Sequence, residues 1–366
     1  MTIISLYYLS FFVLFWVNRD NIQKSNVRYG QIILSFVLLF VFFGFRDITV
    51  LNDTPHYYAP VREKMARGAS LGWFDIDVFS RIELGYQIFE NFVAKLFSNP
   101  FAIIMVSSLI ITLANINFFK KTKNGLFLCL FLMLNFQLIL QYSAIRQGLA
   151  AAIIYYGFTH YFKGNWKIFI GSVLLATTFH ITAIMMLLLL PLSKIHFNKK
   201  TIILFIISFF VIARYLIEPI VGIFSTDNQY LGVNEERESI PIASLMFSLL
   251  NLWLFYLSRK LSSKYHIEVN NKQWMYSAVC LLISFMDIVF PIIGRVSMYL
   301  FPVLVLTFVQ VIMAVPERRY RDKTILSVFL VFFAWFITYN LVRPDWYNLY
   351  PYSFMNINNI FMDFYY

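Results

Sequence analysis

Long apolar blocks separated by short polar segments run through the chain from its first residues to residue 342. Examples are Ile32 to Phe45, Ser297 to Val315 and Ile325 to Leu341. A helix needs about 20 apolar residues to cross roughly 30 Å of hydrocarbon, and these blocks approach or reach that length. The pattern predicts an all-α, polytopic integral membrane protein.

We expect about twelve transmembrane helices. The predicted spans are 2–17, 30–45, 101–119, 125–142, 144–162, 166–179, 180–193, 201–217, 242–258, 273–293, 296–314 and 324–341. One region leaves two alternatives open, because helices of about 14 residues reach only about 21 Å each at a rise of 1.5 Å per residue. Residues 166–193 form either one crossing or a shallow pair of helices broken around His180.

Basic residues collect in alternate loops between the blocks. Six loops contain 19 of the 30 Lys and Arg residues but only four of the 19 acidic residues, a net charge of +15 against −4 for the rest of the chain. These loops are 18–29, 120–124, 163–167, 194–200, 259–272 and 315–323. Since cytoplasmic loops are enriched in Lys and Arg, we predict that both termini are extracytoplasmic.

The chain reads as one membrane domain, residues 1–366, with three outer segments at about 46–99, 214–241 and 343–366. The first outer segment contains amphipathic runs, and one of them has apolar residues at a spacing of four. These residues are Leu84, Ile88, Phe92 and Leu96. Such a run predicts a helix that lies along the outer boundary between membrane and water.

Composition supports this class and narrows the chemistry. Apolar residues make up 60% of the chain, charged residues only 13%, and the mean hydropathy is +0.67. The net charge of +11 does not indicate nucleic-acid binding, because the basic residues follow the loop pattern of a membrane protein. Cys129 and Cys280 lie in apolar blocks without the spacing of a metal site, so we expect neither metal nor cofactor. The first block has no basic leader or cleavage site and is predicted to be a retained span.

Charged and titratable residues stand at the outer ends of several different spans. Inserting a charged side chain into the bilayer costs roughly 2.5–3.5 kcal/mol by insertion scales, so a charged residue there needs an explanation. The residues concerned are Arg46, Arg146, His180 and Arg295. Together they suggest an anion pocket, because Arg binds phosphate oxygens with two parallel hydrogen bonds. Each also has a structural explanation, such as a snorkelling Arg or a buried core His.

Outer carboxylates and aromatic rings complete the candidate site. Glu83 and Asp53 could accept a proton as general base, although an acid at a helix start is also favoured by the helix dipole. Tyr57 and Tyr86 could stack on sugar rings, although residues of this kind also form interfacial belts.

The order of these motifs resembles the EpsG-type, or Wzy-like, bacterial polysaccharide polymerases. The matching elements are Arg46, Asp53 to Tyr57, Glu83 with Gly85 and Tyr86, Arg146 with Gln147, Ala176 to His180, Arg295 to Tyr299, and Pro351 with Tyr352. One departure concerns the loop before Asp53. Members of the family commonly have Gly shortly before the Asp, whereas Asn52 stands here.

The resemblance implies an enzyme of the bacterial cytoplasmic (inner) membrane that joins undecaprenyl-diphosphate-linked oligosaccharide repeats into O-antigen, capsule or exopolysaccharide. It implies a GT-C-like membrane glycosyltransferase as one architecture, with a flippase and a chain-length regulator as pathway partners. Glu83 is the first choice as base, beside Arg146 and His180 as catalytic residues. Substrate binding is expected from Arg46, Asp53, Tyr57, Tyr86, Gln147, Arg295 and Tyr299.

Two other classes stay open. A flippase or other transporter fits the number of spans, but it should show two related halves and cationic residues at mid-depth. Among other membrane glycan transferases, a ligase shares substrates of this kind but should present one dominant outer loop. An acyltransferase usually carries an early His or Arg motif, and residues 1–45 contain nothing like it. The sequence names neither the sugars nor the linkage.

Overall fold

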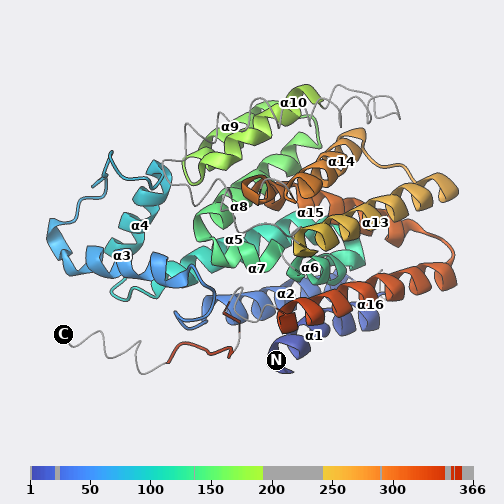
Figure 1. The fold of residues 1–366 in the computed structure, drawn as a ribbon, viewed down its shortest axis with the longest axis horizontal. Coiled ribbons are helices and arrows are strands. Elements are labelled where there is room, and N and C mark those ends of the chain that lie inside the picture. The colour runs from blue at the N-terminus through green and yellow to red at the C-terminus, as the bar shows by residue number, and fades with distance from the viewer. Residues whose placement is uncertain are drawn as a thin grey trace. The chain divides into compact units, whose positions relative to one another are not determined.

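Every regular element in the described part of the chain is a helix (Figure 1). The computed structural model describes residues 2–20, 25–135, 137–192, 242–288, 291–342, 348–349 and 351–356. Within these ranges the backbone pairing of β type is one isolated bridge between Arg46 and Phe354. The predicted all-α class is therefore confirmed. The predicted span 201–217, the outer segment 214–241 and most of the segment 343–366 lie outside the described residues.

The chain divides into two units, and the first contains Met1–Ile184 with Arg318–Tyr366. Its helices are α1 (Thr2–Asn18), α2 (Ser25–Gly44), α3 (Thr54–Ala66), α4 (Leu84–Leu96), α5 (Ala102–Phe119), α6 (Leu126–Leu134), α7 (Gln137–Ser143), α8 (Ile145–Tyr161), α9 (Trp166–Thr177) and α16 (Arg318–Val342). Short 3-10 turns follow α3 and α5, at Gly68–Ser70 and Lys120–Gly125. Unit 1 carries most of the residues that the sequence singles out.

The second unit is Met185–Glu317. It contains α10 (Leu189–Leu192), α13 (Ile242–Tyr265), α14 (Asn271–Met286) and α15 (Pro291–Ala314). The 3-10 helix η3 (Ile181–Leu188) begins in the first unit and ends in the second. Inside the second unit, the Ser248 hydroxyl donates to the backbone oxygen of Ser284 at 2.6 Å, which joins α13 to α14 within an apolar interior.

Within the described residues the predicted spans fall on helices, but several of these helices are too short or too bent for a full crossing. Among the described residues, four helices are long and apolar enough to span a membrane, or five if the bent pair α6–α7 is one span. The four are Ala102–Thr122, Ile242–Tyr265, Gly294–Ala314 and Arg318–Val342. The boundary predicted near 293–296 is wrong by several residues, since α14 ends at Met286 and α15 begins at Pro291. An integral membrane protein is therefore supported, while the count of twelve crossings stays a prediction.

Trp166–Thr177 and Ile181–Leu192 form two short apolar helices rather than one long one. Helix α9 ends at Thr177, and the 3-10 helix η3 begins at Ile181, so His180 lies in the break between them. The helix is therefore interrupted here, and the choice between one crossing and a shallow pair stays a prediction. Breaks of this kind are tolerated at membrane depth where protein surrounds the freed backbone groups.

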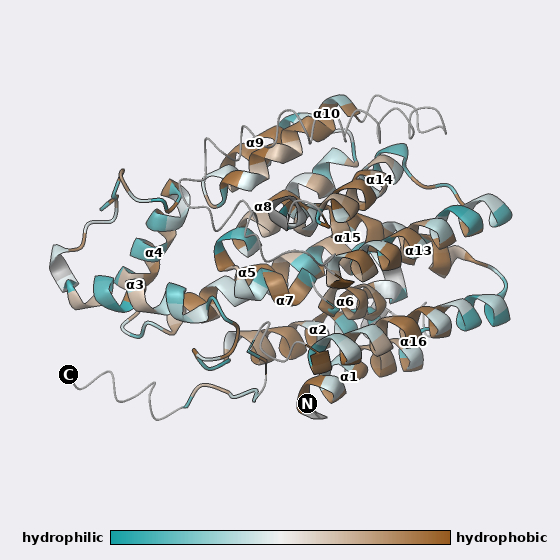
Figure 2. Ribbon diagram, in the orientation of Figure 1, coloured by the Kyte–Doolittle hydropathy of each residue, from teal (hydrophilic) through white to brown (hydrophobic). Residues whose placement is uncertain are grey.

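Aromatic stacking joins the helices of the first unit. The Tyr8 ring of α1 lies 4.4 Å from the Phe131 ring of α6, and Phe12 lies 3.6 Å from Phe329 of α16. Such ring pairs add stabilisation beyond the area that they bury. Apolar residues run along most of these helices in Figure 2, and polar residues gather towards their ends and on α3 and α4.

The outer segment 46–99 is folded, as the amphipathic runs predict. A buried cluster that includes Val61 of α3, Val93 of α4 and Ile103 of α5 ties the three helices together. The predicted apolar stripe of α4 lies on its outside, where Leu84, Phe92 and Leu96 are about half exposed. The buried face of α4 carries the polar residues Gln87, Glu90 and Asn91 beside apolar ones such as Val93. The exposed stripe fits a helix at a membrane boundary, which stays a prediction.

Three loops predicted to be cytoplasmic meet at one end of the first unit. The Asn124 side chain donates to the backbone oxygens of Asn18 and Arg19 at 3.1 and 3.2 Å. Arg28 donates to the backbone oxygen of Lys120 at 2.9 Å. These contacts place loops 18–29 and 120–124 together, as the alternation of basic loops requires.

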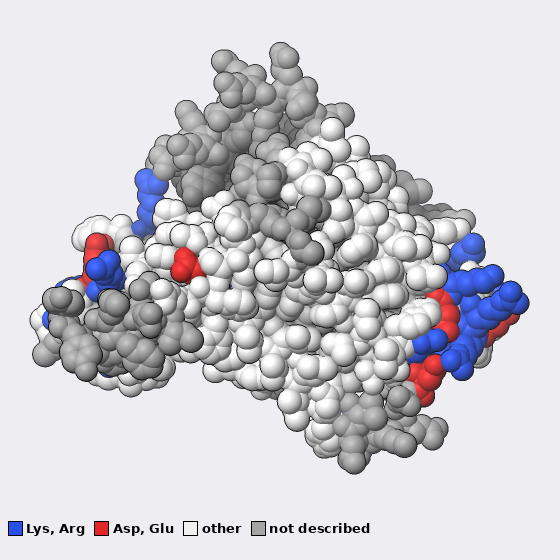
Figure 3. Space-filling model, turned by 90° about the horizontal axis from the view of Figure 1, so that it is seen from below, with Lys and Arg blue, Asp and Glu red and all other residues white. Residues whose placement is uncertain are grey.

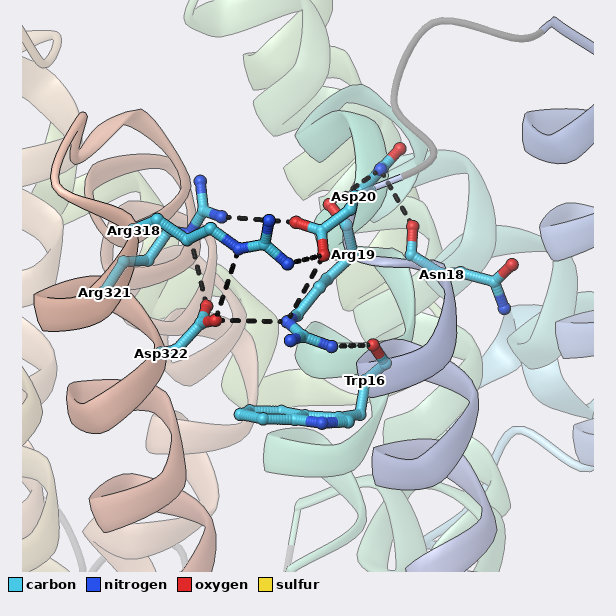
Figure 4. A network of polar contacts seen from close by, with 8 residues as sticks. Trp16, Asn18, Arg19, Asp20, Arg318, Arg321 and Asp322 are labelled. Carbon is cyan, nitrogen blue, oxygen red and sulfur yellow. Dashed lines mark hydrogen bonds and ion pairs between the residues drawn. The ribbon is translucent and has the colours of Figure 1, made fainter.

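Ion pairs add the start of α16 to the same end (Figure 4). Asp322 accepts from Arg19 at 3.4 Å, and Asp20 lies 2.5 Å from Arg318. Arg321 bridges the two carboxylates at 3.6 Å from each. In Figure 3 the middle of the visible face is largely uncharged, and charged side chains gather towards its two sides. An apolar belt between two charged ends is typical of a helical bundle that spans a membrane.

Candidate functional site

The junction of α7 and α8 presents Arg146. Ala144, between the helices, has φ −82° and ψ 72°, so the helical path breaks and α8 starts afresh with Arg146 in its first turn. A Cβ at Gly148 would collide with the backbone oxygen of Gln141 and with Ile111. Only glycine at position 148 therefore allows α8 to pack this closely on α7 and α5.

A second close approach brings α4 to the break after α9. The Gly85 amide donates to the backbone oxygen of Thr178 at 2.8 Å, and a Cβ at Gly85 would collide with the Thr178 side chain. Glycine in the Glu83-Leu84-Gly85 motif thus lets the start of α4 lie against the end of α9. The contact carries Glu83 to within reach of His180.

Glu83 joins the two presented side chains through different oxygens. Its Oε2 accepts from Nη1 of Arg146 at 2.8 Å, and its Oε1 lies 3.0 Å from Nδ1 of His180. The Ile181 amide also donates to Oε1, at 3.1 Å. The Glu83 side chain is 15% exposed and makes no capping bond to its own helix. Glu83 therefore links α4, α8 and the break after α9, beyond any helix-start role.

The electrostatics keep Glu83 ionised. Burial alone would raise the pKa of this carboxyl, but the hydrogen bond from His180 and the charge of Arg146 outweigh burial and lower it below its usual range. Nδ1 of His180 donates to the ionised Glu83, so in a neutral imidazole Nε2 is the acceptor. Nε2 is buried and has no hydrogen-bond partner among the described residues.

Two tyrosines and an aspartate surround Arg146. The Tyr57 hydroxyl hydrogen-bonds Arg146, and burial raises the pKa of Tyr57 so that the phenol stays neutral. The Tyr86 ring packs edge-on against Tyr57, with centroids 5.8 Å apart. Asp53 accepts a long hydrogen bond of 3.4 Å from Ser143, at the end of α7. The structure thus brings Asp53, Tyr57 and Tyr86 to the neighbourhood of the Glu83 cluster.

Arg46 lies inside the protein. Its guanidinium is fully buried and donates to Thr54 Oγ1 at 3.3 Å, to Ser108 Oγ at 3.1 Å, to the backbone oxygen of Tyr142 at 2.8 Å, and to that of Phe43. These bonds tie α2, α3, α5 and α7 together just before Arg146. In this structure Arg46 has a positioning role, and its predicted contact with substrate stays a prediction.

The remaining predicted residues lie deeper or in the other unit. Gln147 is buried on α8 next to Arg146. Arg295 and Tyr299 belong to α15 of the second unit, where Arg295 is exposed and Tyr299 is fully buried. Their contact with substrate also stays a prediction.

Sequence reasoning missed one ion pair close to the site. Glu90 lies two turns after Glu83 on the same face of α4, is 2% exposed, and bonds Lys64 of α3 at 2.8 Å. Burial raises the pKa of Glu90 more than Lys64 lowers it. The spacing of seven residues on one helix face was a usable signal.

The described residues contain no group of three or more His, Cys, Asp or Glu side chains that could hold a metal ion. What the site offers is a carboxylate, a guanidinium and an imidazole in one hydrogen-bonded set at the ends of membrane-associated helices. Such a set can take a proton and stabilise an anion.

These features define a helical integral membrane protein with a hydrogen-bonded carboxylate, guanidinium and imidazole at one end of its helices. A family-level sequence comparison matches the EpsG family over residues 31–354, nearly the whole chain. The chain belongs to the EpsG family, whose members are polysaccharide-polymerase-type membrane proteins. No curated protein and no solved structure matches it.

Proposed function

We propose that the protein joins undecaprenyl-diphosphate-linked oligosaccharide repeats into O-antigen, capsule or exopolysaccharide at the outer face of the bacterial inner membrane. The family supports the class of product. The placement of the Glu83 cluster supports the side, because it lies away from the end where the basic loops meet (Figure 1). A flippase and a chain-length regulator are the proposed partners of this pathway.

One observation carries the proposal: the Glu83 carboxylate holds Arg146 with one oxygen and His180 with the other, at 2.8 and 3.0 Å. The sequence favoured Glu83 as the base. The geometry favours a different division of labour, because a carboxylate with a lowered pKa and two bound partners is a weak proton acceptor. We therefore assign the base to Nε2 of His180 and the orienting role to Glu83.

In the proposed reaction, a hydroxyl of the acceptor repeat attacks the anomeric carbon of the donor sugar. A new carbon–oxygen bond forms there, and the bond from that carbon to the diphosphate oxygen breaks. The hydroxyl proton passes to His180 Nε2, and undecaprenyl diphosphate leaves with the bonding electron pair. A buried, unpartnered acceptor is costly, and a substrate hydroxyl would satisfy it.

Arg146 suits the leaving diphosphate. Its guanidinium has five N–H donors, and Glu83 and Tyr57 engage only part of that set. The side chain is 31% exposed, so an anion has access to it. Preorganised donors of this kind stabilise charge that develops in the transition state.

Purified protein in proteoliposomes, supplied with purified lipid-linked repeat, tests the proposal. We expect a ladder of products that differ by one repeat, and the ladder should disappear with His180→Gln. Movement of the lipid-linked repeat across the bilayer without a new glycosidic bond would identify a transporter. Transfer to a different acceptor, or of an acyl group, would identify one of the other transferases.

A further inference from the structure

The segment between α3 and α4 carries strongly exposed apolar side chains. Phe79 is 94% exposed, Phe74 75% and Trp73 46%, with Val78 at 80%. Exposed aromatic residues that gather in one short segment commonly mark a binding surface. Together, Trp73, Phe74 and Phe79 form what we name the aromatic segment.

Two buried amides of α4 hold the backbone of this segment in place. Gln87 accepts from the Asp77 amide at 2.9 Å and donates to the backbone oxygens of Asp77 and Ile82 at 3.1 and 2.6 Å. Asn91 donates to the backbone oxygen of Asp75 at 2.9 Å. The rings are therefore exposed on a fixed backbone, and a fixed backbone lowers the entropic cost of binding.

The aromatic segment lies next to the catalytic cluster. Glu83 lies four positions after Phe79, so their Cα atoms are at most about 14 Å apart. Figure 1 shows α3, α4 and the segment between them beyond the ends of α2, α5 and α8. A chain leaving the Glu83 cluster on this side meets the aromatic segment first.

The chemistry of the segment separates three classes of partner. Asp75 and Asp77 lie between Phe74 and Phe79 in the sequence, and carboxylates oppose insertion into lipid. A stable protein interface needs roughly 800 Å² on each partner, more than three side chains supply. Rings beside hydrogen-bonding groups suit a sugar, which presents apolar C–H faces and hydroxyls. Lys95 stands 4.8 Å from the Trp73 ring and Arg67 bonds Asp75, so charged groups also border the surface.

We propose that the aromatic segment is a carbohydrate-binding platform that holds the polysaccharide as it leaves the Glu83–His180 centre. This inference rests on the proposed polymerase function. It adds a binding site for several sugars of the growing chain, outside the catalytic cluster. A platform of this kind keeps the product bound between additions and so sets the chain length.

The test uses a double variant that combines Phe74→Ala and Phe79→Ala. The matched control is Val78→Ala. Val78 is as exposed as the two rings but has no aromatic face. In proteoliposomes with purified lipid-linked repeat, the double variant should shorten the products severalfold while the first joining step stays within about twofold. Phe79→Trp should keep wild-type lengths.

Direct binding separates failure of the platform from failure of the polymerase function. Lipid-free polysaccharide released from wild-type cells is the probe. The double variant should bind it about tenfold more weakly, at roughly threefold per ring, and Val78→Ala should bind normally. If the wild type polymerises and the double variant shows unchanged binding and product length, the platform proposal is wrong and the polymerase function stands. Wild type that binds polysaccharide but makes no ladder would overturn the polymerase function instead.

Measuring how deeply residue 79 lies in the membrane tests the lipid bilayer as the alternative partner. Both native cysteines are fully buried, so Phe79→Cys can carry a single fluorescent label. We expect soluble quenchers to reach the label and lipid-phase quenchers to leave it unaffected. Quenching from the lipid phase would overturn the carbohydrate assignment.

Discussion

Glu83 ties the site together because each of its carboxylate oxygens meets a different partner. The Arg146 and His180 side chains do not contact one another through any hydrogen bond found among the described residues, so the carboxylate sets their spacing. Arrangements in which an acid orients a histidine recur in proton-transfer sites, since the acid fixes which ring nitrogen is free.

The pH dependence of activity tests which group accepts the proton. The pKa of Glu83 is lowered from its usual value near 4.5, so Glu83 stays ionised as the pH falls towards that value. Glu83→Gln should lower turnover by about 10² because the histidine loses its orienting charge. The acidic limb of the pH–rate profile should nevertheless persist at reduced height. Disappearance of that limb in Glu83→Gln would return the role of base to Glu83.

Arg146→Lys tests the recognition of the diphosphate. Lysine keeps the charge but loses the planar fork, so we expect most polymerisation activity to be lost while the protein remains in the membrane. Arg62→Lys on the exposed side of α3 is the matched control and should be normal. Normal polymer from Arg146→Lys would make Arg146 an anchor for α8 rather than a substrate ligand.

At the scale of elements, two glycines decide whether the site forms. Gly85 and Gly148 stand where α4 meets the end of α9 and where α8 meets α7. Each approach is too close for a Cβ, so the backbone contacts depend on residues that carry no chemistry themselves.

Gly85→Ala should therefore impair a site that it does not touch. The added methyl would press on Thr178, at a cost of roughly 1–3 kcal/mol, and move Glu83 away from His180. We expect lower thermal stability and a large loss of activity. Gly171→Ala on α9 has open space around it and should leave activity unchanged. Full activity in Gly85→Ala would mean that the α4–α9 contact is not needed for catalysis.

At the scale of the whole molecule, the ends of the first unit differ in kind. One end gathers arginines and lysines from three loops, with Asp20 and Asp322 pairing the arginines. The opposite end carries the Glu83 cluster and the folded segment between α2 and α5. The orientation in the membrane decides whether that cluster can meet substrates at the outer face.

Introduced cysteines test this orientation. Both native cysteines are buried, so we expect them to react little with the labelling reagent. An impermeant thiol reagent added outside should label Ser70→Cys, and should label Lys121→Cys and Ser263→Cys only after permeabilisation. All three positions are in the described chain, and Ser70, Lys121 and Ser263 are exposed. If the reagent labels Ser263→Cys from outside but not Lys121→Cys, residues 166–193 cross the membrane once and the later helices are inverted. Labelling of Lys121→Cys from outside would overturn the charge-based orientation.

Much of the helical framework was readable from the chain. Apolar blocks and basic loops predicted the helices around α1, α2, α5, α8, α13 and α16, because hydrophobic length and loop charge are local properties. The break at His180 was one of two alternatives, since too few residues were present for two full crossings. The number of crossings stays a prediction, because several helices are shorter than a span.

The sequence also singled out the residues of the site, but it did not predict which of their side chains contact one another. Charge at span ends singled out Glu83, Arg146 and His180, because unpaired polar groups in such places are costly. Only the tertiary structure decided that Glu83 joins the other two, that Arg46 is buried among backbone oxygens, and that the apolar stripe of α4 faces outward. These outcomes depend on how helices distant in sequence approach one another, and that approach is set by packing at positions such as Gly85 and Gly148, which no local pattern specifies.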